Sequence, residues 1–289
     1  MRPRRRSPLQ RRYRLNWPKA YRAFERLMDD KQDTAQVFTI IRALAGRSVA
    51  RGYNRLLETP DGGRMAYERM ELADLLMDLP GLSRLADGSV GAAYGQFVAT
   101  ERLSPQELIR KSRRGFDSRR NDIPHPHAWF GRRVRDTHDI WHVLTGYGRD
   151  PLGEACLAAF SYAQTGGLGW ALIAVGSAFK AAWRPEPVRK AILEGYVRGR
   201  NAAWLLGEDY VRLLGEPLVA ARTRLRLAKP PRIYESIPPA DRVGHTRPRG
   251  SLFGKPNHDE PARGQHNGSE LARLAPAEAL GAASTPPGA

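Results

Sequence analysis

Two histidines four residues apart, His138 and His142, are the residues best placed to do chemistry. On a helix this spacing puts both imidazoles on one face, one turn apart, where they can bind one metal ion as in His-Glu-x-x-His helices. Asp139 lies beside His138 and can add an oxygen ligand, and Glu154 follows a glycine-containing turn and can return from the next helix. The spacing therefore predicts a divalent metal site formed by His138, Asp139, His142 and Glu154.

The donor set of two nitrogens and two carboxylates contains no thiolate, which suits zinc or another divalent transition metal. A histidine pair with a nearby acid also occurs by chance on surface helices, and that alternative stays open. The apolar neighbours Ile140, Trp141 and Leu144 favour the metal site, because they predict a buried helix. Buried polar groups are costly without partners, and one cation would satisfy them all.

The string His-Asp-x-x-His, followed after eleven residues by Glu154, resembles the metal motif of the Coq4 family of ubiquinone biosynthesis. The segment Gly88–Phe97 resembles that family's Gly-Ser-Leu-Gly-x-x-Tyr-x-x-Phe segment, and Phe160–Gly166 agrees as well. The resemblance runs from about residue 30 to about residue 235.

The resemblance implies a metal-dependent carbon–carbon lyase that removes the ring C1 carboxylate of a polyprenylated 4-hydroxybenzoate-type precursor, with or without oxidation at that carbon. It implies that His138, Asp139, His142 and Glu154 bind the metal and are catalytic. Its implied partners are a polyprenylated aromatic lipid, a membrane surface and other ubiquinone-biosynthesis proteins. One alternative is a non-catalytic lipid-binding scaffold that organises those enzymes, and another is a metal-dependent hydrolase. No proton donor is predicted, since Asp136 and Tyr162 are near only in sequence.

The chain carries a formal net charge of +17 over 289 residues, with seven arginines and no acid between residues 2 and 14. Such a charge attracts polyanions. Nucleic acid is the weaker candidate, because no zinc-finger, RRM or KH signature is present. A peripheral membrane contact is favoured, and the densest internal basic run could face headgroups or be a solvated loop. That run comprises Arg110, Lys111, Arg113, Arg114, Arg119 and Arg120.

The N-terminus has no apolar stretch typical of a secretory signal, and Pro3 and Pro8 interrupt the amphipathic helix that a transit peptide needs. The composition, rich in Ala, Arg and Gly, favours a bacterial cytoplasmic protein, peripheral on the inner face of the cell membrane, with a mitochondrial inner-membrane location if the source is a eukaryote. Leu168–Trp183 is the most apolar segment but is too short to span a bilayer, which predicts that the protein is not an integral membrane protein. Homo-oligomerisation stays open.

Hydrophobic periodicity predicts an all-α fold: a single multi-helix domain over residues 17–235, with a flexible basic arm at 1–16 and a disordered tail at 236–289. The expected helices are 17–30, 34–46, 49–57, 65–79, 88–98, 106–113, 129–145, 151 onward, 168–183, 187–214 and 217–227. Asp150 is the expected N-cap and Pro151 the first helical residue, which puts Glu154 in the first turn.

Several other residues have local predictions. Cys156 is expected in the core rather than in the site. His125 and His127 are expected in a solvated loop over residues 115–127. The glycines from Gly166 to Gly176 leave room for a close neighbour, either a helix or a lipid tail.

Overall fold

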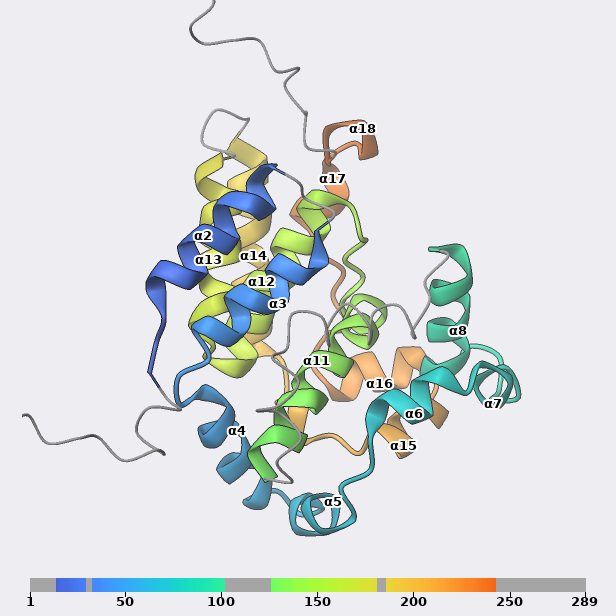
Figure 1. Cartoon of the computed structure of the whole chain (residues 1–289). Helices are drawn as coiled ribbons and strands as arrows, with labels where there is room; N and C mark the ends of the chain where they lie inside the picture. Colours follow the sequence, from blue (N-terminus) through green and yellow to red (C-terminus); the bar gives the residue numbers. More distant parts are fainter. Residues whose placement is uncertain (1–13, 30–32, 102–125, 181–185, 243–289) are drawn as a thin grey trace, which may run out of the picture. The chain divides into compact units, whose positions relative to one another are not determined.

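The computed structural model describes residues 14–29, 33–101, 126–180 and 186–242. Within these ranges no β-strand occurs, and one isolated bridge joins Ser89 and Pro217, so the predicted all-α class is confirmed. The helices belong to one compact unit, Met1–His245, and the second unit, Thr246–Ala289, lies outside the described residues. In chain order (Figure 1) they are α2 (Trp17–Asp29), α3 (Thr34–Ala43), α4 (Ser48–Leu57), α5 (Gly62–Glu68), α6 (Leu72–Met77), α7 (Leu79–Ser83), α8 (Val90–Thr100), α11 (Pro126–Thr145), α12 (Pro151–Thr165), α13 (Leu168–Lys180), α14 (Glu186–Asn201), the 3-10 turn η2 (Leu205–Gly207), α15 (Tyr210–Gly215), α16 (Leu218–Arg224), α17 (Arg232–Ser236) and α18 (Pro239–Arg242).

The main core forms where α12 packs against α14, the most extensive helix pair among the described residues. Gly195 of α14 lies against the backbone of Cys156, where a Cβ would stand 3.0 Å from the carbonyl carbon and 3.2 Å from Cα. Such close approach needs residues without bulk. Cys156 is fully buried, which confirms its predicted place in the core.

Helices α2, α3 and α13 pack together through small residues. A Cβ at Gly169 would overlap the backbone of Ile41 in α3, and one at Gly176 would overlap the ring of Phe24 in α2. The neighbour that these two glycines admit is therefore a helix. Within the described residues, no helix combines the length and hydrophobicity needed to cross a bilayer.

Two expected long helices are broken, and both predictions are wrong in this respect. The segment 65–79 divides after α5, where Arg69 adopts a left-handed conformation at φ 49°, and again at Asp78, which lies between α6 and α7 and accepts from Gly81 N as the N-cap of α7. The segment 187–214 divides at Asn201 because backbone N–H groups beyond it form hydrogen bonds with distant residues instead of continuing the helix. Ala203 N donates to Leu225 O, and Leu205 N donates to the Gln164 side chain.

The limits of other segments also differ from prediction. Helix α11 begins at Pro126, three residues before the expected start, so residues 126 and 127 are helical rather than loop. Ser236 is the last residue of α17 and Pro239–Arg242 form α18, so the disorder predicted from residue 236 does not hold for these residues. The expected helix 106–113, the internal basic run and residues 243–289 lie outside the described residues.

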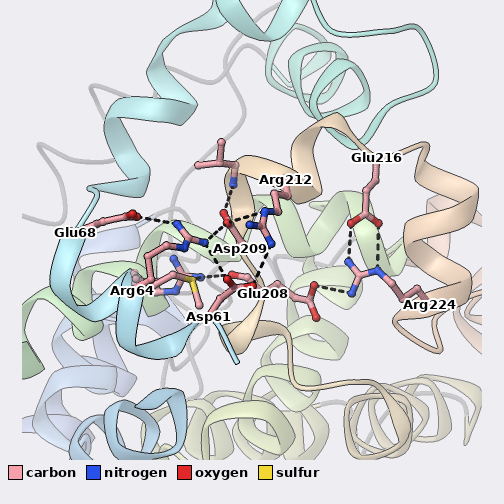
Figure 2. A network of polar contacts seen from close by, with 11 residues as sticks. Asp61, Arg64, Glu68, Glu208, Asp209, Arg212, Glu216 and Arg224 are labelled. Carbon is pink, nitrogen blue, oxygen red and sulfur yellow. Dashed lines mark hydrogen bonds and ion pairs between the residues drawn. The ribbon is translucent and has the colours of Figure 1, made fainter. Parts of the chain in front are cut away.

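A network of ion pairs ties α5 to the segment that follows α14 (Figure 2). Arg64 contacts Asp209 at 2.6 Å and Glu68 at 2.9 Å, while Arg224 joins Glu208 at 2.7 Å and Glu216 at 2.9 Å. Arg133 of α11 is buried and donates to the carbonyl oxygens of Leu206 and Glu208. The network thereby connects the helix that carries the two histidines to α5, α15 and α16.

Candidate metal site

His138 and His142 lie one turn apart on α11, with ring centroids 5.1 Å apart. Asp139 joins them: one ligand atom from each of the three residues lies within 4.8 Å of the others. His142 is 2% exposed, whereas His138 and Asp139 are half-buried. These three residues could hold a metal ion.

The ring of His142 is oriented by the turn that follows α11. Its Nδ1 lies 2.9 Å from the carbonyl oxygen of Tyr147. A carbonyl only accepts, so Nδ1 carries the hydrogen, and in the neutral ring Nε2 keeps its lone pair. That Nε2 is buried with no hydrogen-bond partner. Metal-binding histidines are commonly held in this way: one ring N–H donates to a backbone carbonyl, which fixes the tautomer, and the other ring nitrogen is left to bind the metal.

The local signals at the start of α12 place Glu154 as predicted. Asp150 is the N-cap and accepts from Leu152 N at 3.1 Å and Gly153 N at 2.9 Å, and Pro151 opens the helix. Glu154 therefore lies in the first turn of α12 and reaches both rings of α11. Its Oε2 is 3.4 Å from His138 Nε2, and its Oε1 is 3.6 Å from His142 Nε2.

The electrostatics of the cluster favour positive charge between the rings and the carboxylate. Burial alone would lower the pKa of His142, but the Glu154 carboxylate outweighs it and raises that pKa above 6.5. Burial would raise the pKa of Glu154, yet the two histidines hold it well below its usual range. Arg149 adds a cationic group, with Nε 3.6 Å from Glu154 Oε1. The residues present thus fit a bound cation: two histidine nitrogens and nearby anionic oxygens.

Arginines hold the C-terminal end of α11 in place. Arg222 donates to the carbonyl oxygens of Leu144 at 3.1 Å and Val143 at 2.8 Å, and Arg198 donates to that of Thr145 at 3.0 Å. These bonds satisfy carbonyls that a helix end leaves without intrahelical partners, and positive charge suits that end. The last turn of α11, which carries His142, is therefore fixed from outside.

Aromatic side chains from two other helices wall the site. Phe97 of α8 stacks on His142 with centroids 5.5 Å apart, and Trp170 of α13 stacks on His138 at 5.3 Å. Tyr94 of α8 is buried, and burial together with the charges of Asp139 and Asp136 raises its pKa. None of these aromatic residues was predicted to lie at the site, and the one sequence signal for Tyr94 and Phe97 was the resemblance of the Gly88–Phe97 segment.

Other polar residues considered from the sequence lie elsewhere. Asp136 is buried and pairs with Arg135 at 2.5 Å, and Tyr162 stacks on Tyr196 with centroids 5.9 Å apart. His127 lies in the first turn of α11 and contacts the ring of Tyr53, outside the three-residue group. His125 and the basic run from Arg110 lie outside the described residues.

Comparisons of the sequence with a family model and with individual proteins point to the same family. A family model described as "Coenzyme Q (ubiquinone) biosynthesis protein Coq4" matches residues 20–231. The mitochondrial ubiquinone biosynthesis protein COQ4 of Phaeosphaeria nodorum is 31% identical over 190 residues, covering 63% of this chain and 60% of that protein. The mitochondrial COQ4 homolog of Rattus norvegicus is 27% identical over 189 residues, covering 64% and 67%.

A solved structure gives the same fold. A putative ubiquinone biosynthesis protein from Nostoc punctiforme aligns with a TM-score of 0.54 at 20% identity, covering 75% of this chain and 100% of that one. At this identity the likeness concerns the fold alone. The match covers only about 60% of the length of relatives such as the Phaeosphaeria nodorum protein. From the match to the family model over residues 20–231, the chain belongs to the Coq4 family of ubiquinone biosynthesis proteins.

Proposed function

We propose that this chain binds a divalent metal, zinc by its donor set, through His138, Asp139, His142 and Glu154, and uses it to remove the C1 carboxylate of a polyprenylated 4-hydroxybenzoate-type precursor. The observation that carries the proposal is the buried Nε2 of His142, which has no hydrogen-bond partner while Nδ1 is held by the Tyr147 carbonyl. The Nε2 lone pair and the Glu154 carboxylate oxygen 3.6 Å away are two acceptors that face each other, which costs free energy unless a proton or a cation lies between them.

A metal in this place supplies a Lewis acid that can hold and polarise an aryl carboxylate. The chain's own groups do the rest of the work. Phe97 and Trp170 hold the two imidazole rings in place and restrict water on their faces. Decarboxylation breaks the bond between ring C1 and the carboxylate carbon, carbon dioxide leaves, and the bonding electron pair that stays on C1 takes up a proton. In the oxidative version of the reaction, dioxygen would be the two-electron oxidant that places a hydroxyl group on C1 instead.

A precursor with a long prenyl tail resides in a bilayer, so the proposal requires a peripheral membrane contact on the inner face of a bacterial membrane or of the mitochondrial inner membrane. The net charge of +17 favours an anionic surface. On α2, Trp17 and Tyr21 are exposed among the basic residues Arg22 and Arg26, and Phe179 of α13 is 72% exposed. Aromatic and basic side chains together are typical of membrane-interface segments. Other ubiquinone-biosynthesis proteins are the proposed protein partners.

The test compares the wild-type chain with His142→Ala and with His127→Ala, a matched control on the same helix that lies outside the three-residue group. Each protein receives a prenylated hydroxybenzoate in lipid with added zinc or another divalent metal. Metal content is measured by elemental analysis, and loss of the carboxylate is followed by mass spectrometry. We expect turnover and bound metal in the wild type and in His127→Ala, and neither in His142→Ala.

The scaffold alternative makes a different prediction in the same experiment. If the wild type and both variants bind the lipid equally and none turns it over, the chain presents lipid to partner enzymes and the decarboxylase proposal is wrong. If His142→Ala turns over as fast as the wild type, the assigned metal ligands are wrong.

A further inference from the structure

A buried tyrosine of α17 bridges the two elements that carry the proposed metal ligands. Tyr234 is 3% exposed. Its hydroxyl oxygen accepts from Gly148 N at 3.0 Å, and its O–H donates to the Asp150 carboxylate. Gly148 belongs to the turn that follows α11, and Asp150 is the N-cap of α12. One hydroxyl group therefore links the helix that carries His142 to the helix that carries Glu154.

The peptide group that Tyr234 holds is the one that orients the ring of His142. The carbonyl of Tyr147 and the N–H of Gly148 belong to one planar peptide group, so neither can turn without the other. The carbonyl accepts from His142 Nδ1 at 2.9 Å, while the N–H donates to the Tyr234 hydroxyl. Fixing the N–H therefore fixes the carbonyl, and with it the tautomer that leaves the lone pair on His142 Nε2.

These hydrogen bonds all run in one direction, from the imidazole ring to a carboxylate. His142 Nδ1–H donates to the peptide carbonyl, the peptide N–H donates to Tyr234, and the Tyr234 O–H donates to Asp150. Hydrogen bonds connected in this order polarise one another, so the negative charge of Asp150 strengthens the hold on the imidazole hydrogen. A carboxylate that accepts directly from a metal-binding histidine makes that ring a better ligand. Here a peptide group and a hydroxyl stand between the carboxylate and the ring.

The Asp150 carboxylate divides its two oxygens between the hydroxyl and the start of α12. Oδ1 accepts from the N–H groups of Leu152 and Gly153, whereas Oδ2 accepts from Tyr234. The first turn of α12 lies directly on the turn after α11, because a Cβ added at Gly153 would overlap the carbonyl oxygen of Gly148. A Cβ added at Gly148 would stand 2.6 Å from the Tyr234 hydroxyl oxygen. The hydroxyl therefore lies in a junction that leaves no room for another side chain.

The aromatic ring of Tyr234 is held in place by its own neighbours. The ring of Tyr147 packs edge-on against it with centroids 5.4 Å apart, and the guanidinium of Arg242 lies over it at 4.3 Å. The adjacent Ile233 N donates to the Glu194 carboxylate of α14 at 3.1 Å, which anchors α17. A side chain that packing has already ordered loses little further conformational entropy when its hydroxyl forms two hydrogen bonds.

We propose that Tyr234 is a positioning residue of the metal site, which holds the His142 ring in its metal-binding tautomer and couples that ring to the Asp150 carboxylate. The inference rests on the metal site of the proposed function, but it concerns residues outside the four ligands and assumes nothing about the substrate. Tyr234 also lies beyond residue 231, where the match to the family model ends. Partners that orient metal-binding histidines typically change metal affinity by roughly 10–100-fold.

The first measurement is the zinc affinity of the full chain and of Tyr234→Phe, which removes only the hydroxyl, by competition with a chelator. We expect Tyr234→Phe to bind zinc roughly 10-fold more weakly, or weaker still. The matched control is Tyr210→Phe, which removes an equally buried hydroxyl that accepts from Trp141 of α11 at 2.8 Å. Tyr210 does not contact the Tyr147–Gly148 peptide group, so this control should keep the wild-type zinc affinity. Circular dichroism confirms that each variant is folded.

Asp150→Asn separates the hydrogen-bond chain from the start of α12. Asparagine caps a helix about as well as aspartate does, but it is uncharged, and its one oxygen is needed by the N–H groups of α12. It therefore cannot also accept from Tyr234. We expect Asp150→Asn to weaken zinc binding, and the double variant Tyr234→Phe/Asp150→Asn to bind no more weakly than the weaker single variant, because both changes break one chain. Losses that multiply in the double variant would overturn the coupling.

The tautomer of His142 is read without metal. In zinc-free protein at alkaline pH, where the ring is neutral, ring-nitrogen NMR shifts should show the hydrogen on Nδ1 in the wild type and in Tyr210→Phe. In Tyr234→Phe a large fraction of the rings should carry it on Nε2 instead. The inference is overturned if Tyr234→Phe keeps the wild-type tautomer, if it binds zinc as tightly as the wild type, or if Tyr210→Phe loses as much zinc affinity.

The outcomes for the proposed function are distinct from these. If the wild type binds no zinc or other divalent metal, the metal-dependent function is wrong, and the tautomer measurement still decides the role of Tyr234. If zinc binds with the expected pattern among the variants but no carboxylate is lost from the prenylated hydroxybenzoate, the decarboxylase proposal is wrong and the positioning role stands.

Discussion

The contact between α12 and α14 permits a test in which one substitution, glycine to alanine, has opposite effects at two positions. Helix α12 carries Glu154, so its packing decides where that carboxylate lies. At Gly195 in α14, the nearest atoms to an added Cβ are the carbonyl oxygen, carbonyl carbon and Cα of Cys156, all of them backbone. At Gly95 in α8, an added Cβ would meet no described atom within 4 Å other than its chain neighbours and the backbone of its own helix. Both positions are interior to their helices.

The magnitudes follow from two opposing terms. Alanine is favoured over glycine in a helix by about 0.5–1 kcal/mol, which applies at both positions. At Gly195 the methyl group would stand 3.0 Å from the carbonyl carbon of Cys156, and no side-chain rotation can relieve a clash with backbone. Overpacking costs about 1–3 kcal/mol, and the backbone contact places this site at the upper end. Gly195→Ala should therefore destabilise by about 2 kcal/mol, whereas Gly95→Ala should stabilise by about 0.5–1 kcal/mol.

Urea unfolding followed by circular dichroism measures both changes, and thermal unfolding gives a second reading. For a domain of this size about 1 kcal/mol shifts Tm by roughly 2–4 °C, so Gly195→Ala should lower Tm by about 4–8 °C. The reasoning is refuted if Gly195→Ala is as stable as the wild type or more stable. A destabilised Gly95→Ala would contradict the assignment of open space beside α8.

Three further predictions concern charge and exposure. Burial alone would raise the pKa of Asp209, but the hydrogen bond from Arg64 outweighs it and holds that pKa below 3.8. The stabilisation from the Asp209 carboxylate is therefore present above pH 3.8 and is lost as pH falls through the folded-state pKa. The difference in unfolding free energy between wild type and Asp209→Asn, measured by urea unfolding, should shrink between pH 5 and pH 2, and a constant difference would contradict this prediction. The pKa of His142 is raised above 6.5, and a metal that binds its Nε2 must displace the proton of the charged ring. Zinc affinity, measured by competition with a chelator, should therefore fall about tenfold per pH unit below the raised pKa. Zinc affinity that does not fall in this range would show that His142 is not a ligand. Replacing exposed Trp17 and Phe179 by alanine should weaken sedimentation with anionic vesicles severalfold and leave the fold unchanged; equal sedimentation would place the membrane contact elsewhere.

Local features of the chain were predictable because their causes are local. The Asp150-Pro151 pair satisfies the first N–H groups of α12 whatever surrounds it, so the helix start and the first-turn position of Glu154 followed from the residues alone. The four-residue spacing of His138 and His142 required only that α11 be a helix. Burial of Cys156 followed from its place two residues after Glu154, which puts it on the opposite face of the helix.

Helix continuity was predicted less well because it depends on distant partners. The helical pattern of 187–214 did not indicate that the N–H groups of residues 203 and 205 would donate to Leu225 and Gln164 instead of bonding within a helix. Propensity is a weak preference that tertiary contacts override. The left-handed Arg69 that ends α5 is likewise a departure that side-chain periodicity does not register.

The sequence by itself determined the donor types, their spacing on α11 and the family resemblance, since these depend on residue order and helix geometry. Only the tertiary structure decided that the Glu154 carboxylate lies 3.4 Å from the ring of His138, that Phe97 and Trp170 stack on the two imidazoles, and that Trp170 also lines a cavity together with two arginines of α4. These groups come from α8, α12, α13 and α4, which are far apart in the chain. Their meeting depends on how helix faces pack, and no local pattern specifies that packing.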